Sequence, residues 1–129
     1  MAKSWQEKYD SDRPKQIKVL DKDFADMKKG ETMLISTPKD IANYINKLPT
    51  DKNIELATMR KDLAKQYKVD KTCPVTTGIF TRIIAERSLE LMADNKPPIA
   101  PFWKVISPTS HLAHKISSGP ELIEKLRNE

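Results

Sequence analysis

The pattern of apolar and polar residues predicts a first helix over residues 38–48. Apolar residues recur there at intervals of three and four, as on one stripe of a helix: Ile41, Tyr44, Ile45 and Leu48. Thr37 stands at the capping position, Pro38 fits the first helical position, and Pro49 ends the pattern. Because Tyr44 belongs to the stripe, we interpret it as a core residue and not as a catalytic one.

A second helix is predicted over residues 58–67, with Thr58 as its cap. Residues 54–56 alternate between apolar and polar, which favours a short extended segment before this helix. The inward residues of the helix are Met59, Leu63 and Tyr67. Its outward face is mildly basic, and a charged helix face is most often simply solvated.

A third and longer helix is predicted to begin at Pro74. Its apolar face comprises Val75, Ile79, Phe80, Ile83, Ile84 and Leu91. Gly78 inside this helix costs about 1 kcal/mol relative to alanine, which indicates that another group approaches closely there. A helix, a short connection and a helix that opens with small polar residues have the outline of a helix-turn-helix.

The two ends of the chain complete the predicted fold. Residues 1–36 read as an N-terminal arm that docks apolar residues on the domain, with a short strand near Ile17 and Val19. The apolar hexamer at residues 101–106 reads as another strand, and residues 118–129 contain a final short helix that starts at Pro120. We therefore expect a mostly α fold with short strands, in which residues 37–129 form one domain.

Composition limits the functional classes. The 129 residues carry a net charge of +5, which permits an anionic partner but is equally typical of a soluble small domain. One cysteine excludes an internal disulfide and a multi-cysteine zinc site, and it fits a reducing compartment. No apolar run approaches the length needed to span a bilayer, so we expect a cytoplasmic monomer without a membrane partner.

The chain shows no motif of nucleotide, dinucleotide or metal chemistry. His111 and His114 lie three residues apart, but no acidic or cysteine partner is near in sequence, and we interpret them as surface residues. Cys73 stands at a helix start, where a thiol pKa is lowered, yet no base is identifiable beside it. We expect no cofactor and no metal, and a Cys73-based enzyme is a minor alternative.

The order of these elements, and the hexamer Pro-Phe-Trp-Lys-Val-Ile at 101–106, resemble the C-terminal DNA-binding domain of the alkylguanine-DNA alkyltransferases. The family motif there reads Pro-Cys-His-Arg-Val-Ile/Val, and it is followed by a Ser-Gly-Gly turn and a final helix, much as Ser118-Gly119-Pro120 stands here. The body also resembles small bacterial proteins at the edge of this family. The resemblance covers residues 37–129 and implies a winged helix-turn-helix domain.

The resemblance also implies what the site does. Phe102 takes the place of the alkyl-accepting cysteine and Trp103 that of the activating histidine, so self-alkylation is excluded. The alkyltransferase-like proteins, which lack the cysteine, bind the damaged base without repairing it. The implied base pocket comprises Pro101, Phe102, Trp103 and Ser118.

Two further groups follow from the resemblance. The phosphate-contacting residues would be Arg60, Lys61, Lys65 and Lys104. The recognition helix would present Val75, Thr76, Thr77, Gly78 and Arg82. Val75 falls where the family has the arginine that replaces the flipped base, and Arg60 falls near the position of the family's tyrosine.

Two functional hypotheses therefore stand beside the minor enzymatic one. The first is a non-enzymatic protein that binds double-stranded DNA and recognises damaged or alkylated bases. The second is an interaction module on the same fold that binds a protein or a small ligand and no longer binds DNA. The uncharged first turn of the third helix favours the second hypothesis.

Overall fold

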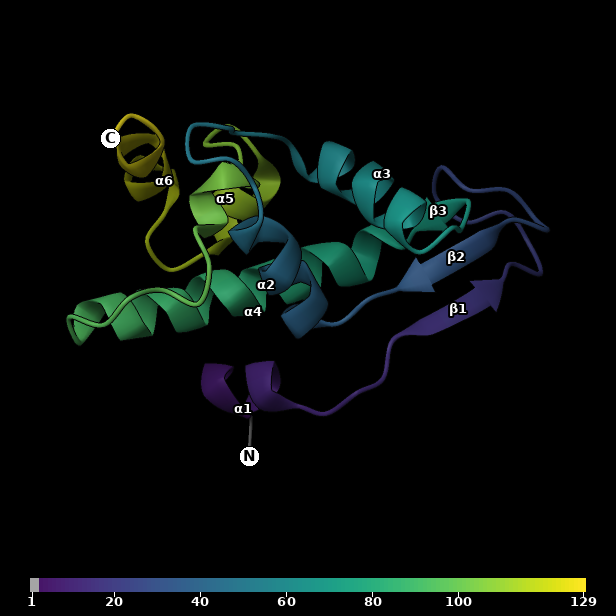
Figure 1. The fold of residues 1–129 in the computed structure, drawn as a ribbon, viewed down its shortest axis with the longest axis horizontal. Helices are drawn as coiled ribbons and strands as arrows, with labels where there is room; N and C mark the ends of the chain where they lie inside the picture. Colours follow the sequence, from purple (N-terminus) through teal and green to yellow (C-terminus); the bar gives the residue numbers. More distant parts are fainter. Residues whose placement is uncertain (1–2) are drawn as a thin grey trace.

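The computed structural model describes residues 3–129 and sets a small sheet beside a helical body (Figure 1). The helices are α1 (Trp5–Asp10), α2 (Pro38–Asn46), α3 (Leu56–Gln66), α4 (Pro74–Ala93), α5 (His111–Lys115) and α6 (Pro120–Arg127), with a 3-10 turn η1 (Phe102–Lys104). The strands are β1 (Gln16–Val19), β2 (Thr32–Ile35) and β3 (Lys71–Thr72). The predicted mostly helical fold with short strands is confirmed.

The sheet joins the start of the chain to its middle. Its strand order is β1-β2-β3, with β2 antiparallel to β1 and parallel to β3. Leu34 on β2 is fully buried, whereas Ile17 and Val19 on the edge strand β1 are more than half exposed. The strand predicted near Ile17 is confirmed, and the segment before residue 37 supplies two of the three strands.

Helix α4 is the central element, in contact with α1, α2, α3 and η1. Its buried residues are Thr77, Phe80, Thr81, Ile83, Ile84, Ala85, Glu86 and Ser88. The prediction that Val75 and Ile79 point inward is wrong, because their side chains are 54% and 52% exposed. The inward side of the first turns is taken by Thr77 and Thr81, whose hydroxyls donate to carbonyls four residues back at 2.6 and 2.7 Å.

A buried carboxylate ties α4 to the connection between α5 and α6. Glu86 is 4% exposed, and its Oε1 accepts hydrogen bonds from the backbone N–H (3.2 Å) and the hydroxyl of Ser117 (2.5 Å). Its Oε2 lies 3.5 Å from Nε of Arg82 on the same helix. A buried charge is tolerated when it is paired in this way, so Glu86 fixes where the chain leaves α5.

Two of the predicted helix starts, those of α2 and α6, agree with the structure. Thr37 Oγ1 accepts the N–H of Asp40 (3.1 Å) at the start of α2, as predicted. Helix α6 begins at Pro120 behind Gly119, whose φ of 72° is a backbone conformation that favours glycine. The capping role predicted for Thr58 is wrong, since α3 begins at Leu56 with Glu55 at the cap.

The strand predicted over residues 101–106 is absent from the described residues 3–129. The extended segment predicted at residues 54–56 ends at Glu55, since Leu56 already belongs to α3, and the Ile54 N–H donates to the carbonyl of Lys104 (2.7 Å). Residues 101–106 contain the η1 turn, closed by the Lys104 N–H and the Pro101 carbonyl (3.0 Å). A short apolar run fits either conformation, and tertiary packing decides between them.

Asp70, the residue before β3, is hydrogen-bonded to the first residue of β2. Its Oδ2 accepts from the N–H (2.9 Å) and the hydroxyl (3.1 Å) of Thr32, and its own N–H donates to Thr32 Oγ1 (3.0 Å). The hydrogen bonds from the backbone and side chain of Thr32 lower the pKa of the Asp70 carboxyl. This carboxylate therefore stabilises the fold above the pKa of the unfolded state and ceases to do so as the pH falls through the lowered folded pKa.

We predict that Asp70→Asn lowers stability at neutral pH and that the difference from the wild type shrinks as the pH falls below about 4. Urea unfolding followed by circular dichroism at a series of pH values measures this. Asp51→Asn, on an exposed aspartate in the turn after α2, is the control. A difference that stays constant down to about pH 3 would contradict the role given to Asp70.

A candidate binding groove on helix α4

The exposed stripe of α4 forms the floor of a groove of about 660 Å³. The floor carries Val75, Gly78, Ile79 and Arg82, spaced at i, i+3, i+4 and i+7, so they lie on one face of the helix. The walls come from α1, from the start of α3 and from α5. They are lined by Trp5, Lys8, Leu56, His111, Leu112 and Lys115.

Most of the groove is apolar. Val75 and Ile79 are more exposed than any other large apolar residues on the described helices. A Cβ atom on Gly78 would meet no atom within 4 Å, so the protein's own packing does not require a glycine there. Since a glycine inside a helix costs about 1 kcal/mol relative to alanine, the first turns of α4 are not optimised for stability.

The charged residues of the groove are all cationic within the described part of the chain. Lys8 Nζ lies 4.4 Å from the ring centroid of Trp5, and Arg82 Cζ lies 5.3 Å from the same centroid. The indole therefore holds a cation from α1 and another from α4 at the edge of the groove. Lys115 lines the groove from α5 and is exposed. The arrangement suits an apolar ligand that carries negative charge.

Helix α1, which supplies one wall, is set by a local signal. The hydroxyl of Ser4 accepts the N–H of Glu7 (3.1 Å), and the Glu7 carboxylate accepts the N–H of Ser4 (3.1 Å). This reciprocal capping box, Ser-x-x-Glu, is readable in the sequence and could have placed a helix at Trp5. The prediction of an arm over residues 1–36 did not include this helix, and Trp5 and Lys8 were therefore not predicted as groove residues.

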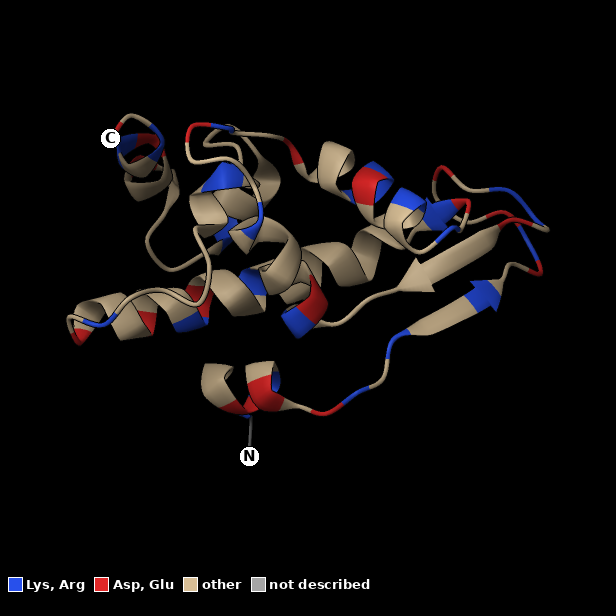
Figure 2. Ribbon diagram, in the orientation of Figure 1, with Lys and Arg blue, Asp and Glu red and all other residues tan. Residues whose placement is uncertain are grey.

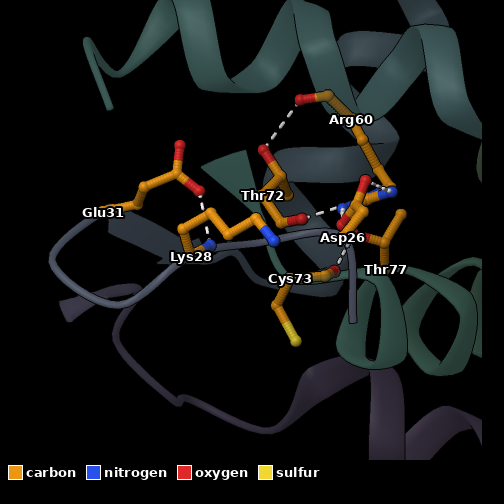
Figure 3. Close-up of polar contacts among 7 residues, drawn as sticks. All are labelled: Asp26, Lys28, Glu31, Arg60, Thr72, Cys73 and Thr77. Carbon is orange, nitrogen blue, oxygen red and sulfur yellow. Dashed lines mark hydrogen bonds and ion pairs between the residues drawn. The ribbon is translucent and has the colours of Figure 1, made fainter. Parts of the chain in front are cut away.

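Of the five predicted recognition residues, three line the groove and two do not. Val75, Gly78 and Arg82 line the groove. Thr77 is 1% exposed and its hydroxyl bonds the Cys73 carbonyl, so its predicted role as a recognition contact is wrong (Figure 3). Thr76 is half-buried, and its hydroxyl oxygen makes no hydrogen bond with any described residue.

The predicted phosphate residues do not form one surface. Arg60 Nε donates to the Thr72 carbonyl (2.9 Å), and its Nη2 lies 3.1 Å from Oδ1 of Asp26 (Figure 3). This pairing lowers the pKa of the Asp26 carboxyl, chiefly through its hydrogen bond with Arg60. Lys61 and Lys65 are exposed on α3, outside the residues that line the groove.

The prediction that Lys104 contacts phosphates is wrong. The residue is 9% exposed, and its ammonium donates to the carbonyl of Pro49 (2.9 Å), 55 positions earlier in the chain. Helices α3 and α4 carry both basic and acidic residues, whereas β2 carries no charged residue (Figure 2). Arg60 and Lys104 both donate to backbone carbonyls of the protein itself.

The predicted base pocket is largely closed. Phe102 is fully buried in the core, which leaves no ring face for a stacked base and makes its predicted role wrong in this structure. Trp103 is half-buried and meets Phe102 edge to face, with ring centroids 5.2 Å apart and planes at 77°. Pro101 and Ser118 are also half-buried, and all four residues lie outside the lining of the α4 groove.

The cysteine and the two histidines considered in the sequence analysis do not form a reactive or metal-binding site in the described residues. Cys73 is 4% exposed beside Met27 and Met33, and its N–H donates to the Leu34 carbonyl (2.9 Å). His111 and His114 are exposed, as predicted. No group of three potential metal ligands occurs among residues 3–129. The helices described here include none that is both long and apolar enough to cross a membrane.

Comparisons of the chain with protein-family models, with curated proteins and with solved structures gave no match.

Proposed function

We propose that the chain is a non-catalytic binding protein whose ligand lies in the α4 groove. The observation that carries this proposal is the stripe Val75, Gly78, Ile79 and Arg82, with Val75 and Ile79 exposed, at the floor of a 660 Å³ concavity. Ligand sites are concave and mostly apolar, with a few polar groups that set orientation, and their volumes run from about 300 to 1,000 Å³. The groove meets each of these criteria.

The proposal agrees with the second hypothesis from the sequence, an interaction module that binds a protein or a small ligand. The binding site differs, because it lies on α4 and not at Phe102 and Trp103. Phe102 is fully buried and Trp103 half-buried within η1, so this proposal gives them a structural role and places binding on α4. We also propose that α3 and α4 are the helix pair of a domain with the alkyltransferase fold. This part of the proposal rests on the sequence resemblance and on the order of the helices.

We predict that 1-anilinonaphthalene-8-sulfonate, an apolar dye with one negative charge, binds the native protein and that Ile79→Ser weakens this binding at least fivefold. The reason is that Ile79 contributes exposed apolar surface on the groove floor, worth about 1 kcal/mol when half of it is covered. Dye fluorescence titrations measure the affinity. Thermal unfolding checks that the variant is folded.

Ile17→Ser is the matched control, because Ile17 is the same residue type with the same 52% exposure on the edge strand β1. We expect it to leave dye affinity unchanged. Equal losses in the two variants would show that the dye binds exposed apolar residues in general, and the proposal would then fail.

Duplex DNA is a second candidate ligand for the same face. The observation that favours it is that Val75 and Ile79, on the first two turns of α4, are exposed between Lys8 and Lys115, as a recognition helix between phosphate contacts would be. It ranks second because a recognition helix must protrude into a major groove about 12 Å wide. Here α1 and α5 supply walls beside α4, so the helix forms the floor of a concavity.

If DNA is the ligand, affinity for plain and alkylguanine duplexes falls linearly with the logarithm of salt concentration. The double variant Lys8→Gln, Lys115→Gln should then lower that slope by about two. Electrophoretic mobility shifts at several salt concentrations measure both effects. The absence of a complex at about 50 mM salt, where phosphate contacts are strongest, would sink the DNA candidate.

A further inference from the structure

The floor of the groove has the spacing of a surface that packs against a helix. Val75, Gly78, Ile79 and Arg82 follow the i, i+3, i+4, i+7 pattern by which one helix presents a stripe to another. From Val75 to Ile84 and beyond, the opposite side of α4 is buried in the core, so this stripe is the side of the helix left without a partner. At a rise of about 1.5 Å per residue the stripe is about 11 Å long, which matches about two turns of a partner helix.

Gly78 sits in the middle of this stripe, where two helix axes would come closest. Open space surrounds the position of its missing Cβ, so the glycine serves no contact within the described chain. A small residue at a helix crossing lets the partner's backbone approach, and helix axes pack about 8 to 10 Å apart depending on the side chains between them. The glycine thus favours a broad, rigid occupant over a thin acyl chain, which needs no such opening.

The charge of the groove selects among possible helices. Lys8 and Lys115 lie beside the apolar floor, Arg82 lies at its end and pairs with Glu86, and the lining contributes no Asp or Glu from the described residues. A helix with acidic residues on both sides of an apolar stripe would complement this pattern, whereas a basic helix would bring like charges together. A second copy of this chain, with a net charge of +5, would carry the same cationic groove.

We infer that the α4 groove binds an amphipathic helix of a partner protein, with an apolar stripe flanked by Asp and Glu. This inference rests on the proposed binding function and names the class of its ligand. The partner's apolar side chains would cover Val75 and Ile79, its backbone would cross α4 at Gly78, and its carboxylates would pair with Lys8 and Lys115.

A designed peptide pair tests the inference on the full chain. The probe is an 18-residue helical peptide with Leu at i, i+3, i+4 and i+7 positions and Glu beside the stripe, and the matched peptide has Lys in place of every Glu. Trp5 lines the groove, so its fluorescence can report binding alongside peptide anisotropy. We expect the Glu peptide to bind at least tenfold more tightly than the Lys peptide, with a preference that weakens as salt is added.

Protein variants place the peptide on the groove. Gly78→Leu should weaken the Glu peptide at least tenfold while thermal stability stays equal to the wild type or rises, because the new side chain occupies space that is open in the free protein. Gly78→Ala, the smaller change at the same position, should have a lesser effect on affinity. Lys115→Glu should narrow or reverse the preference for the Glu peptide over the Lys peptide.

Each other outcome overturns the inference in a recognisable way. Equal affinity for the two peptides, or affinity unaffected by Gly78→Leu, rejects an acidic helix as the occupant. If the Glu peptide fails to bind while the anionic dye still binds and Ile79→Ser weakens it, the groove is a ligand site of another class and the proposed function survives. If neither peptide nor dye binds, both proposals fail. Self-association of the chain that blocks the peptide would assign the groove to a second copy.

Discussion

The structure depends on a constraint on α4, which is packed against other elements along its length and yet leaves one stripe of its first turns uncovered. The helix contacts α1, α2, α3 and η1, and its buried side includes small polar residues whose hydroxyls bond within the helix itself. Thr77 and Thr81 therefore enter the core without needing partners elsewhere. That solution turns Val75 and Ile79 outward. Leaving each of them half exposed forgoes about 1 kcal/mol, and Gly78 costs about 1 kcal/mol more.

A loss of about 3 kcal/mol is a substantial share of the 5 to 15 kcal/mol that stabilises most domains. The remaining contacts show how the fold supports an uncovered stripe. Glu86 holds the connection after α5 against α4, and Arg127 on α6 donates to the carbonyls of Trp103 (2.6 Å) and Ile54 (3.0 Å). These bonds position the start of α3 and the α5 segment, which supply one wall of the groove. The groove is thus built by the same interactions that close the core.

Much of the fold could be predicted from local signals. The cap at Thr37 and the proline at each first helical position correctly predicted where α2 and α6 begin. The capping box at Ser4 was equally available for α1. The sequence could not tell which side of α4 faces the core, because its apolar residues occur on more than one side, and only the placement of Thr77 and Thr81 decides it. The hexamer at 101–106 was ambiguous for the same kind of reason, since short apolar runs fit several conformations.

The candidate site was harder to predict because it depends on contacts distant in sequence. The Lys104 ammonium is buried and donates to a carbonyl 55 positions away, and Arg60 pairs with Asp26, 34 positions away. The resemblance to the alkyltransferases directed attention to Phe102 and Trp103, and the packing instead closes Phe102 into the core. Three residues of the predicted recognition helix, Val75, Gly78 and Arg82, line the groove, whereas Thr77 of the same helix is buried.

Methyl groups report most directly whether the first turns of α4 are an open floor. Paramagnetic relaxation of side-chain methyl signals by a soluble gadolinium chelate measures their access to solvent in the free protein. The structure predicts strong relaxation for Val75 and Ile79, similar to that of Ile17, and weak relaxation for Ile84 on the buried side. Val75 and Ile79 methyls protected to the same degree as those of Ile84 would mean that the stripe is already covered, and would contradict the account.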